Sequence, residues 1–331
     1  MYTVPRGHDL VRQKMPELVT ISIPTYRRPS LLLHALHSCL LQDYRPIEID
    51  ISDDSPSPES ESLVRSIPLP PAFSLRYWRN SPSLKQAANV NKLFAEARGS
   101  KLVLLHDDDV LLPGAISALY DSFSLSPSVV AAYGIQQVIL ENGEVSPSDT
   151  EHHNAIGHRT PEFTGLQHDL LECALWQQFP NNGYLVDTAL ARSIGYRSDE
   201  EIGDACDGDF GIRLALACRG SHFAFLNRYT SQYRLMTSSL RTSHNNTWKG
   251  YDYVLTLKDL TPRQVQVRDE VLRRSAEQAV VDNALHGRRK RALEIFFSRF
   301  YPRWKSPLKA AYHLGLLAVP QLVTLRDRIR S

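Results

Sequence analysis

The stretch LLHDDDVLLP, residues 104–113, places three consecutive aspartates directly after an apolar run. Residues 102–105 predict a buried strand, and Asp107, Asp108 and Asp109 follow where that strand ends. Neighbouring carboxylates repel one another, so such a cluster costs free energy unless a cation lies close by. Acids that complement a helix N-terminus are the alternative, but three in a row exceed what a helix end needs. We therefore predict a cation site at this strand end.

Strands and helices alternate along the chain before this stretch. The expected elements are a strand over 18–24, a helix over 31–41, a strand over 47–52, a helix over 58–66, a strand near 74–78 and a helix over 84–97. Alternation at this pace is typical of a parallel sheet that is covered by helices on both faces. The predicted fold is therefore α/β, with a mostly parallel central sheet.

The second half of the chain has a weaker pattern. The expected elements are strands over 129–133 and 136–140, a helix over 188–194, a helix over 209–219 and a strand over 222–226. Residues 146–179 are polar and rich in histidine, and we interpret them as a mobile or substrate-facing insertion. From residue 263 onward the pattern predicts helices.

Composition excludes several classes of protein. The chain has 331 residues, of which 42% are hydrophobic and 22% charged, as in ordinary globular proteins. Its four cysteines are scattered without a CxxC pair, which argues against a zinc site or a disulfide framework. Residues 1–17 lack the apolar core of a signal peptide, and the apolar segment 310–325 is too short to span a bilayer. We expect a cytoplasmic protein.

Positive charge is concentrated at the C-terminal end. From Arg288 onward the chain carries eleven Lys and Arg residues against Glu294 and Asp327. The segment RFYPRW, residues 299–304, mixes these cations with aromatic side chains, a combination typical of segments that lie on an anionic membrane surface. A helical tail packed on the domain and a contact between subunits are the alternatives. No nucleic-acid reading motif accompanies the charge, so nucleic acid is not an expected partner.

A second acidic pair ends another predicted strand. Asp53 and Asp54 follow the apolar run at 47–52. Ligands of open parallel sheets bind beyond the carboxyl ends of the strands, so both acidic clusters are expected to share one crevice. Carboxylate oxygens suit Mg²⁺ or Mn²⁺, and such an ion can bridge a diphosphate.

Three motifs resemble the glycosyltransferases of family 2, which have the GT-A fold. VTISIPTYRRP (19–29) with IEIDISDDS (47–55) resembles the family's opening, and AEARGSKLVLLHDDDVLLP (95–113) resembles its metal-binding DXD strand. DGDFGIRL (207–214) resembles the acidic segment before a late helix. The resemblance covers about residues 18–240 with the motifs in the family's order.

This resemblance implies an inverting transfer of a sugar from a nucleotide diphosphate sugar, with UDP as the expected nucleotide. The implied catalytic residues are Asp207 and Asp209, either of which could be the general base. The implied nucleotide-binding residues are Pro24, Thr25, Tyr26, Arg28, Asp53, Asp54, Lys85, Asn91, Asp107 and Asp108. The implied metal ligands, for Mn²⁺ or Mg²⁺, are Asp107, Asp108 and Asp109. Two residues depart from the family pattern, because His106 and Cys206 stand where many members have acids.

The implied chemistry agrees with the residue types. A carboxylate can take the proton of an acceptor hydroxyl as the hydroxyl attacks, while a metal ion stabilises the departing diphosphate. The expected acceptor is a glycan or lipid-linked saccharide of the cell surface, reached from the inner face of the cytoplasmic membrane. A nucleotidyltransferase is an alternative, although the first strand lacks its glycine-rich loop. A non-catalytic sugar-nucleotide-binding module is another.

The resemblance also suggests how the chain divides. Residues 1–260 are expected to form the transferase domain, with a nucleotide-binding half at about 18–112 and an acceptor half at about 113–260. Residues 261–331 are expected to form a basic helical extension.

Overall fold

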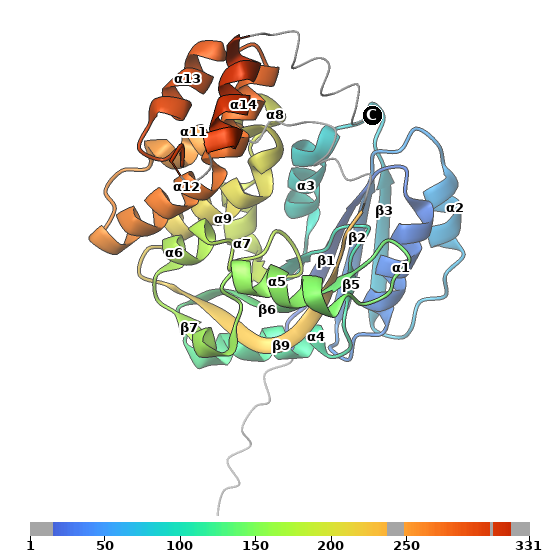
Figure 1. Cartoon of the computed structure of the whole chain (residues 1–331). Coiled ribbons are helices and arrows are strands. Elements are labelled where there is room, and N and C mark those ends of the chain that lie inside the picture. Colours follow the sequence, from blue (N-terminus) through green and yellow to red (C-terminus); the bar gives the residue numbers. More distant parts are fainter. Residues whose placement is uncertain (1–15, 237–247, 305–306, 319–331) are drawn as a thin grey trace, which may run out of the picture.

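The computed structural model describes residues 16–236, 248–304 and 307–318. A single twisted sheet runs through the middle of these residues, with helices on both faces (Figure 1). Its strand order is β3-β2-β1-β4-β8-β6-β9-β5, and β7 pairs with β9. The strands are β1 (Val19–Thr25), β2 (Ile47–Asp53), β3 (Phe73–Arg79), β4 (Lys101–Leu104), β5 (Val110–Leu111), β6 (Val129–Ile139), β7 (Gly165–Gln167), β8 (Leu185–Asp187) and β9 (His222–Arg234).

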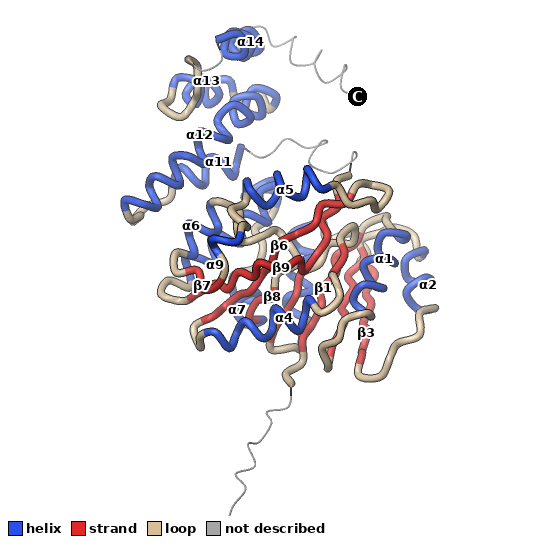
Figure 2. Tube along the Cα trace, turned by 60° about the horizontal axis from the view of Figure 1, so that its bottom comes forward, coloured by secondary structure: helices blue, strands red, loops and turns tan. Residues whose placement is uncertain are grey.

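Helices connect the strands and then continue alone toward the C-terminal end. Those of the sheet region are α1 (Pro29–Leu40), α2 (Glu59–Arg65), α3 (Lys85–Glu96), α4 (Ala115–Asp121), α5 (Pro147–Ile156), α6 (Leu170–Leu175), α7 (Thr188–Ile194), α8 (Asp199–Ile202) and α9 (Cys206–Ala217). The later ones are α11 (Trp248–Thr256), α12 (Pro262–Leu285), α13 (Arg289–Phe297) and α14 (Pro307–Ala318). Figure 2 shows this last group stacked on one side of the sheet domain.

The first four strands in sequence are parallel to one another, as the alternating pattern predicts. β1 lies between β2 and β4, and β2 pairs with β3. Thr25 at the end of β1 is in register with Asp53 at the end of β2, so the carboxyl ends of these strands meet at one edge. The predicted α/β fold with a mostly parallel sheet is therefore confirmed, and the edge is the place where ligands of such sheets bind.

Two apolar clusters hold the helices on the sheet. Alternate residues of β1 and β2, such as Ile21 and Ile49, pack against α1, α2 and α4. On the opposite face, α3, α6, α9 and the C-terminal helices share one cluster that extends from Ala87 to Leu317. The C-terminal helices thus bury their inner side against the same core as the sheet domain.

Residues of β1 and β2 that face α3 are polar and form a buried ionic network. Arg76 of β3 donates to both oxygens of Asp50, at 2.9 and 2.6 Å, and to Glu48 at 3.0 Å. Glu48 also accepts from the hydroxyl of Thr20 and from the backbone N–H of Arg98. One guanidinium therefore neutralises two carboxylates that have almost no access to solvent.

Replacing Arg76 with methionine is expected to lower the free energy of unfolding by about 3 kcal/mol at about pH 8, because two buried carboxylates lose their cation. Burial raises the pKa of Asp50 to about 6, although the hydrogen bonds from Arg76 oppose that shift. A raised folded-state pKa favours folding at acidic pH, and this contribution is lost as the pH rises through the folded value. The defect should therefore shrink near pH 5. Urea unfolding at the two pH values measures it, and a pH-independent loss would contradict this account.

Several predicted boundaries need correction. The expected strands at 129–133 and 136–140 are one strand, β6, and β9 continues from 222 to 234 rather than stopping at 226. The predicted helix at 209–219 begins earlier, at Cys206, so its first turn contains both candidate bases. The sequence signals for loops are weak in these segments. The β6–β9 pair contains shifts of register, and these shifts accommodate local irregularities so that both strands continue through them.

Residues 146–179 are not a loose insertion. They form α5, β7 and α6, with Ser146 capping the first of these helices. Three of their histidines lie against aromatic rings: His153 stacks on Tyr233 and His158 on Trp176, while His168 meets His222 edge to face. The local histidine content therefore reflects packing on β9 and α6, which the sequence alone cannot show.

The expected helical C-terminal region is present as α12, α13 and α14. Within the described residues, no helix is both long and apolar enough to cross a bilayer. The closing basic residues Arg326, Arg328 and Arg330 lie outside the described part of the chain.

Candidate active site

The acidic triplet follows β4 at the edge where the parallel strands end. Asp107 turns toward β1, where its carboxylate accepts a hydrogen bond from the hydroxyl of Thr25 at 2.7 Å and one from the backbone N–H of Tyr26 at 3.3 Å. Burial, together with the charge of Asp108, raises the pKa of Asp107 to about 6. The ends of β1 and β4 are thus joined through this carboxylate, and the register of β1 with β2 brings Asp53 to the same edge of the sheet.

Arg28 supplies positive charge beside the triplet. Its guanidinium lies 2.6 Å from Asp108 and 3.4 Å from Asp107, and its side chain is 27% exposed. The N-terminal segment of α1 therefore holds a partly accessible cation next to the carboxylates, in a position where it could also meet a negatively charged ligand.

Asp109 is the most enclosed member of the triplet. One carboxylate oxygen accepts from the backbone N–H of Arg234 at 2.8 Å, and the side chain of Arg234 donates to the carbonyl of Asp108. The other oxygen, Oδ2, is buried and makes no hydrogen bond within the described residues. Burial, reinforced by Asp108, raises the pKa of Asp109 to about 7. A buried carboxylate oxygen without a donor is the kind of atom that a cation would satisfy.

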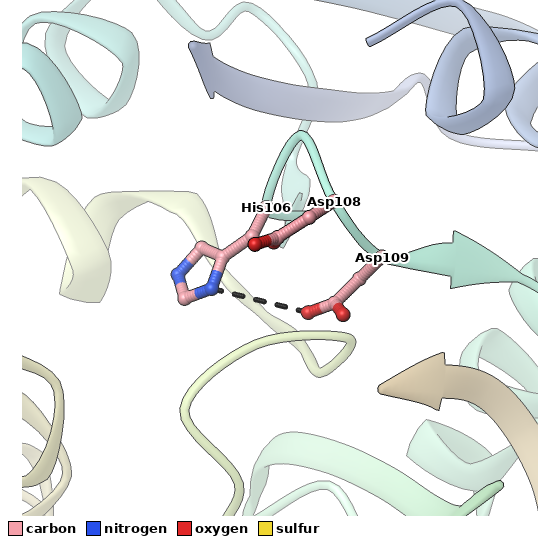
Figure 3. Close-up of side chains that lie close together, drawn as sticks. All are labelled: His106, Asp108 and Asp109. Carbon is pink, nitrogen blue, oxygen red and sulfur yellow. Dashed lines mark ion pairs between the residues drawn. The ribbon is translucent and has the colours of Figure 1, made fainter. Parts of the chain in front are cut away.

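His106 joins the triplet to a second acidic residue. Its Nδ1 lies 3.9 Å from Oδ2 of Asp109 and 3.3 Å from the amide nitrogen of Asn182, while its Nε2 lies 3.9 Å from Asp207 (Figure 3 shows the first contact). Burial lowers the pKa of this imidazole, but the four surrounding aspartates outweigh burial and raise it overall. The ring therefore sits between two carboxylates, one from the turn after β4 and one from α9.

Three side chains could hold one metal ion. His106, Asp108 and Asp109 each offer a ligand atom, and these atoms lie within 4.8 Å of one another (Figure 3). The family resemblance also implies Asp107 as a metal ligand, but its carboxylate instead faces Thr25 and Arg28. The structure thus groups the histidine, rather than Asp107, with the other two aspartates.

Asp207 lies in the first turn of α9, opposite the triplet. Its Oδ1 accepts a hydrogen bond from the hydroxyl of Tyr196 at 2.8 Å, and its side chain is 14% exposed. Burial raises the pKa of Asp207, while His106 and the Tyr196 hydroxyl oppose the shift. A buried carboxylate with a raised pKa and some access to solvent is well suited to accept a proton.

Tyr196 is itself held by α3. The side-chain amide of Asn91 accepts from the backbone N–H of Tyr196 at 2.6 Å and donates to its carbonyl at 2.8 Å. Gly195 has a φ of +55°, and a Cβ there would lie 3.0 Å from the same amide oxygen, so glycine allows this close approach. Asn91, predicted as a nucleotide ligand, thus supports the segment that orients Asp207.

Asp209 is placed differently from Asp207, although only two residues separate them. Both of its oxygens are bound by arginines: Oδ1 by Arg197, and Oδ2 by Arg197 at 3.0 Å and Arg213 at 2.7 Å. The carboxylate is 1% exposed, and the guanidinium of Arg197 lies 4.3 Å from the ring of Tyr253 in α11. Asp209 therefore links α9 to the C-terminal helices, and its oxygens are already occupied.

Replacing Asp209 with alanine is expected to lower the free energy of unfolding by about 2–3 kcal/mol, since two arginines lose a buried partner but keep partial contact with water. Chemical denaturation measures the change. The exposed Asp204, in the same segment, provides the matched control, and its alanine variant should unfold like the wild type. Unchanged stability in Asp209→Ala, together with lost activity, would instead make Asp209 the base.

The remaining predicted nucleotide-binding residues lie at the ends of β1 and β2 and at the start of α3. Asp53 is fully buried, accepting from the hydroxyl of Tyr77 and the backbone N–H of Ser55. Asp54 accepts from Asn80, from Ser83 and from the backbone N–H of Leu84, and so fixes the loop before α3. Pro24 is half-buried in β1, whereas Tyr26 and Lys85 are exposed.

Two contributors to this site escaped the sequence analysis. Tyr196 carries no local motif, and its contact with Asp207 depends on how α7 and α9 pack. The family resemblance marks His106 only as a residue that stands where many members have an acid. A histidine next to three aspartates was the one signal available, since imidazole is a common metal ligand.

Comparison with known proteins identifies a family and several proteins that this chain resembles. Residues 20–175 match the family described as glycosyl transferase family 2, and they include β1, β2 and the acidic triplet. The acidic triplet thus lies within the segment that matches glycosyltransferase family 2. Among curated proteins, a GalNAc(5)-diNAcBac-PP-undecaprenol beta-1,3-glucosyltransferase of Campylobacter jejuni is 37% identical over 107 residues, which are 32% of this chain and 34% of that protein. An uncharacterised protein of Mycobacterium tuberculosis is 33% identical over 121 residues, or 37% of each chain. The chain thus spans about a third of the length of these two relatives.

Solved structures share the fold over most of the chain. Residues 1–349 of Staphylococcus aureus TarS, in complex with UDP-GlcNAc, superpose with a TM-score of 0.61 at 14% identity, covering 94% of this chain and 91% of that one. The mannosyltransferase PcManGT of Pyrobaculum calidifontis, in complex with GDP-Man and Mn²⁺, gives 0.55 at 14% identity, with coverage of 93% and 87%. The family's GT-A-like fold is therefore confirmed for this chain.

Proposed function

We propose that this protein is an inverting glycosyltransferase that moves a sugar from a nucleotide diphosphate sugar to a hydroxyl group of a saccharide acceptor. The observation that carries the proposal is the position of Asp207: it comes from α9, yet lies 3.9 Å from His106 and so faces the acidic triplet after β4. A carboxylate base and a separate charged cluster, facing one another across a single site, are what inversion requires.

In the proposed reaction, Asp207 accepts the proton of the acceptor hydroxyl. The hydroxyl oxygen forms a bond with the anomeric carbon, the bond from that carbon to the phosphate oxygen breaks, and the nucleoside diphosphate leaves. Tyr196 holds Oδ1 of Asp207 at 2.8 Å, so we assign Oδ2 as the atom that takes the proton. Arg28, next to Asp107 and Asp108, is positioned to meet the negative charge of the diphosphate.

The residues fit a divalent metal ion. Asp108 and Asp109, together with His106, would hold it, and it would bind the buried Oδ2 of Asp109, which accepts no hydrogen bond within the described residues. Two carboxylates with one imidazole suit Mn²⁺ better than Mg²⁺, which strongly prefers oxygen ligands. When bound, such an ion stabilises negative charge on a diphosphate as a Lewis acid. The Mn²⁺ present in the PcManGT structure supports the choice.

UDP is our proposed nucleotide, and a lipid-linked saccharide our proposed acceptor. The UDP-GlcNAc bound to TarS supports the first choice, and the undecaprenol in the name of the Campylobacter relative supports the second. Thr25, Tyr26 and Asp54, at the ends of β1 and β2, are the proposed contacts of the base.

A donor panel tests the proposal. Purified protein is incubated with Mn²⁺ and, in separate reactions, with UDP-, GDP- and TDP-sugars, and the free nucleoside diphosphate is measured with and without saccharide acceptors. We expect release from a UDP-sugar that is stimulated by an acceptor and abolished by chelation. Release of pyrophosphate from a nucleoside triphosphate and a sugar phosphate would instead identify a nucleotidyltransferase.

A further inference from the structure

The outer side of the C-terminal helices is unusually apolar. Trp304 and Leu308 are each 88% exposed, Phe297 is 63% exposed and Tyr312 is 51% exposed. We call these four side chains the tail face. They lie on α13, on α14 and on the segment between these helices, which Figures 1 and 2 place away from the sheet.

α14 has apolar residues on both of its sides. Its inner side buries Ala310, Leu316 and Leu317 against the other helices, and His313 bonds to the hydroxyl of Tyr301. Leu308 and Tyr312 are four residues apart, so they share its outer side. A helix at the surface of a globular protein normally has a polar outer side. Here the outer side carries large apolar side chains as well, which indicates that it is covered when the protein acts.

Positive charge surrounds the tail face. Residues 289–318 contain a single acid, Glu294, against Arg289, Lys290, Arg291, Arg299, Arg303, Lys305 and Lys309. Some of these cations pair with acids on α12, as Arg299 does with Asp269 and Lys309 with Glu277, yet these two side chains remain 66% and 53% exposed. The guanidinium of Arg303 lies 5.9 Å from the ring of Phe297, so cations and apolar side chains occupy the same surface.

We propose that the tail face binds the surface of a membrane that contains anionic lipids. Trp304 and Leu308 enter the boundary between headgroups and acyl chains, and the surrounding cations meet the lipid phosphates. A second copy of the chain fits less well, because a symmetric contact would bring the same positive surfaces together. Nucleic acid would leave Leu308 and Phe297 without apolar partners. The inference goes beyond the proposed transfer reaction, and its test requires no sugar donor.

Cosedimentation with vesicles tests this proposal. The full chain is mixed with vesicles of equal parts phosphatidylglycerol and phosphatidylcholine, or of phosphatidylcholine alone, at low and high salt. We expect binding to the anionic vesicles that weakens with salt. The double variant Trp304→Ala/Leu308→Ser should bind at least about tenfold more weakly, since both inserted side chains are lost. Lys290→Gln, on the exposed side of α13, should cost roughly fivefold.

Leu41→Ser is the matched control, because Leu41 is 70% exposed at the distant end of α1. It should bind like the wild type. All variants alter exposed side chains, and thermal melting confirms that each remains folded.

Fluorescence shows whether Trp304 itself enters the lipid. Vesicles should shift tryptophan emission to the blue in the wild type, and Trp304→Phe should remove that shift while retaining binding. Equal binding to vesicles without anionic lipid, or unchanged binding by the double variant, would overturn the proposal. So would concentration-dependent dimerisation that the double variant abolishes, since the tail face would then bind a second copy.

Discussion

Asp207→Asn is expected to bind the nucleotide sugar normally yet transfer sugar at least about a hundredfold more slowly, because the amide cannot accept the proton of the acceptor hydroxyl. The amide oxygen can still accept the hydrogen bond from Tyr196 that now reaches Oδ1, so the local structure should persist. Initial rates measure kcat, and calorimetry with the donor measures binding.

Asp204→Asn serves as the control for Asp207→Asn, since Asp204 is an exposed acid three residues earlier in the same segment. It should retain full activity. Near wild-type turnover in Asp207→Asn would contradict its assignment as the base and return the role to Asp209, despite the two arginines that occupy it.

Tyr196→Phe separates the orientation of Asp207 from its chemistry. The ring remains in the core against Phe94 and Phe210, so only the hydrogen bond to the carboxylate is lost. We expect about a tenfold fall in kcat with little change in KM, because a less well-oriented base slows the chemical step alone. A rise in KM at constant kcat would show that Tyr196 acts in binding instead.

Asp109→Asn is expected to remove Mn²⁺-dependent binding of the nucleotide, with a loss in affinity of at least about a hundredfold. The amide oxygen can still accept from the backbone N–H of Arg234, so the turn after β4 keeps its anchor. Because the variant also removes a buried, repelled carboxylate, its melting temperature without metal should not fall. Titration of UDP with and without Mn²⁺ measures the effect.

Asp107→Asn is the informative comparison for Asp109→Asn. Its carboxylate bonds to Thr25 and lies near Arg28, outside the group of His106, Asp108 and Asp109. It should therefore retain Mn²⁺ dependence while binding the nucleotide more weakly. Normal Mn²⁺-dependent affinity for UDP in Asp109→Asn would contradict the proposed metal site.

Local patterns in the chain were enough to predict the fold and the place of the site. The apolar strands that end in Thr25, Asp53 and Leu104, with helices between them, required a parallel sheet, and such a sheet brings its carboxyl ends together. That three aspartates follow one of these strands also required no tertiary information. These features depend on residues that are close together in the sequence, so they can be predicted from the sequence alone.

The surroundings of each acid, from which its role is proposed, depend on the tertiary structure. The sequence motif does not distinguish Asp207 from Asp209. On α9 their side chains point in different directions, so Asp207 lies near His106, whereas Asp209 is bound by two arginines. Asn91 and Tyr196 meet only because α3 packs beside the segment after α7, 105 residues later. Which apolar residues of α14 face outward likewise depends on the packing of its inner side against the other helices. Burial and charge at a side chain depend on distant segments, and folding alone brings those segments together.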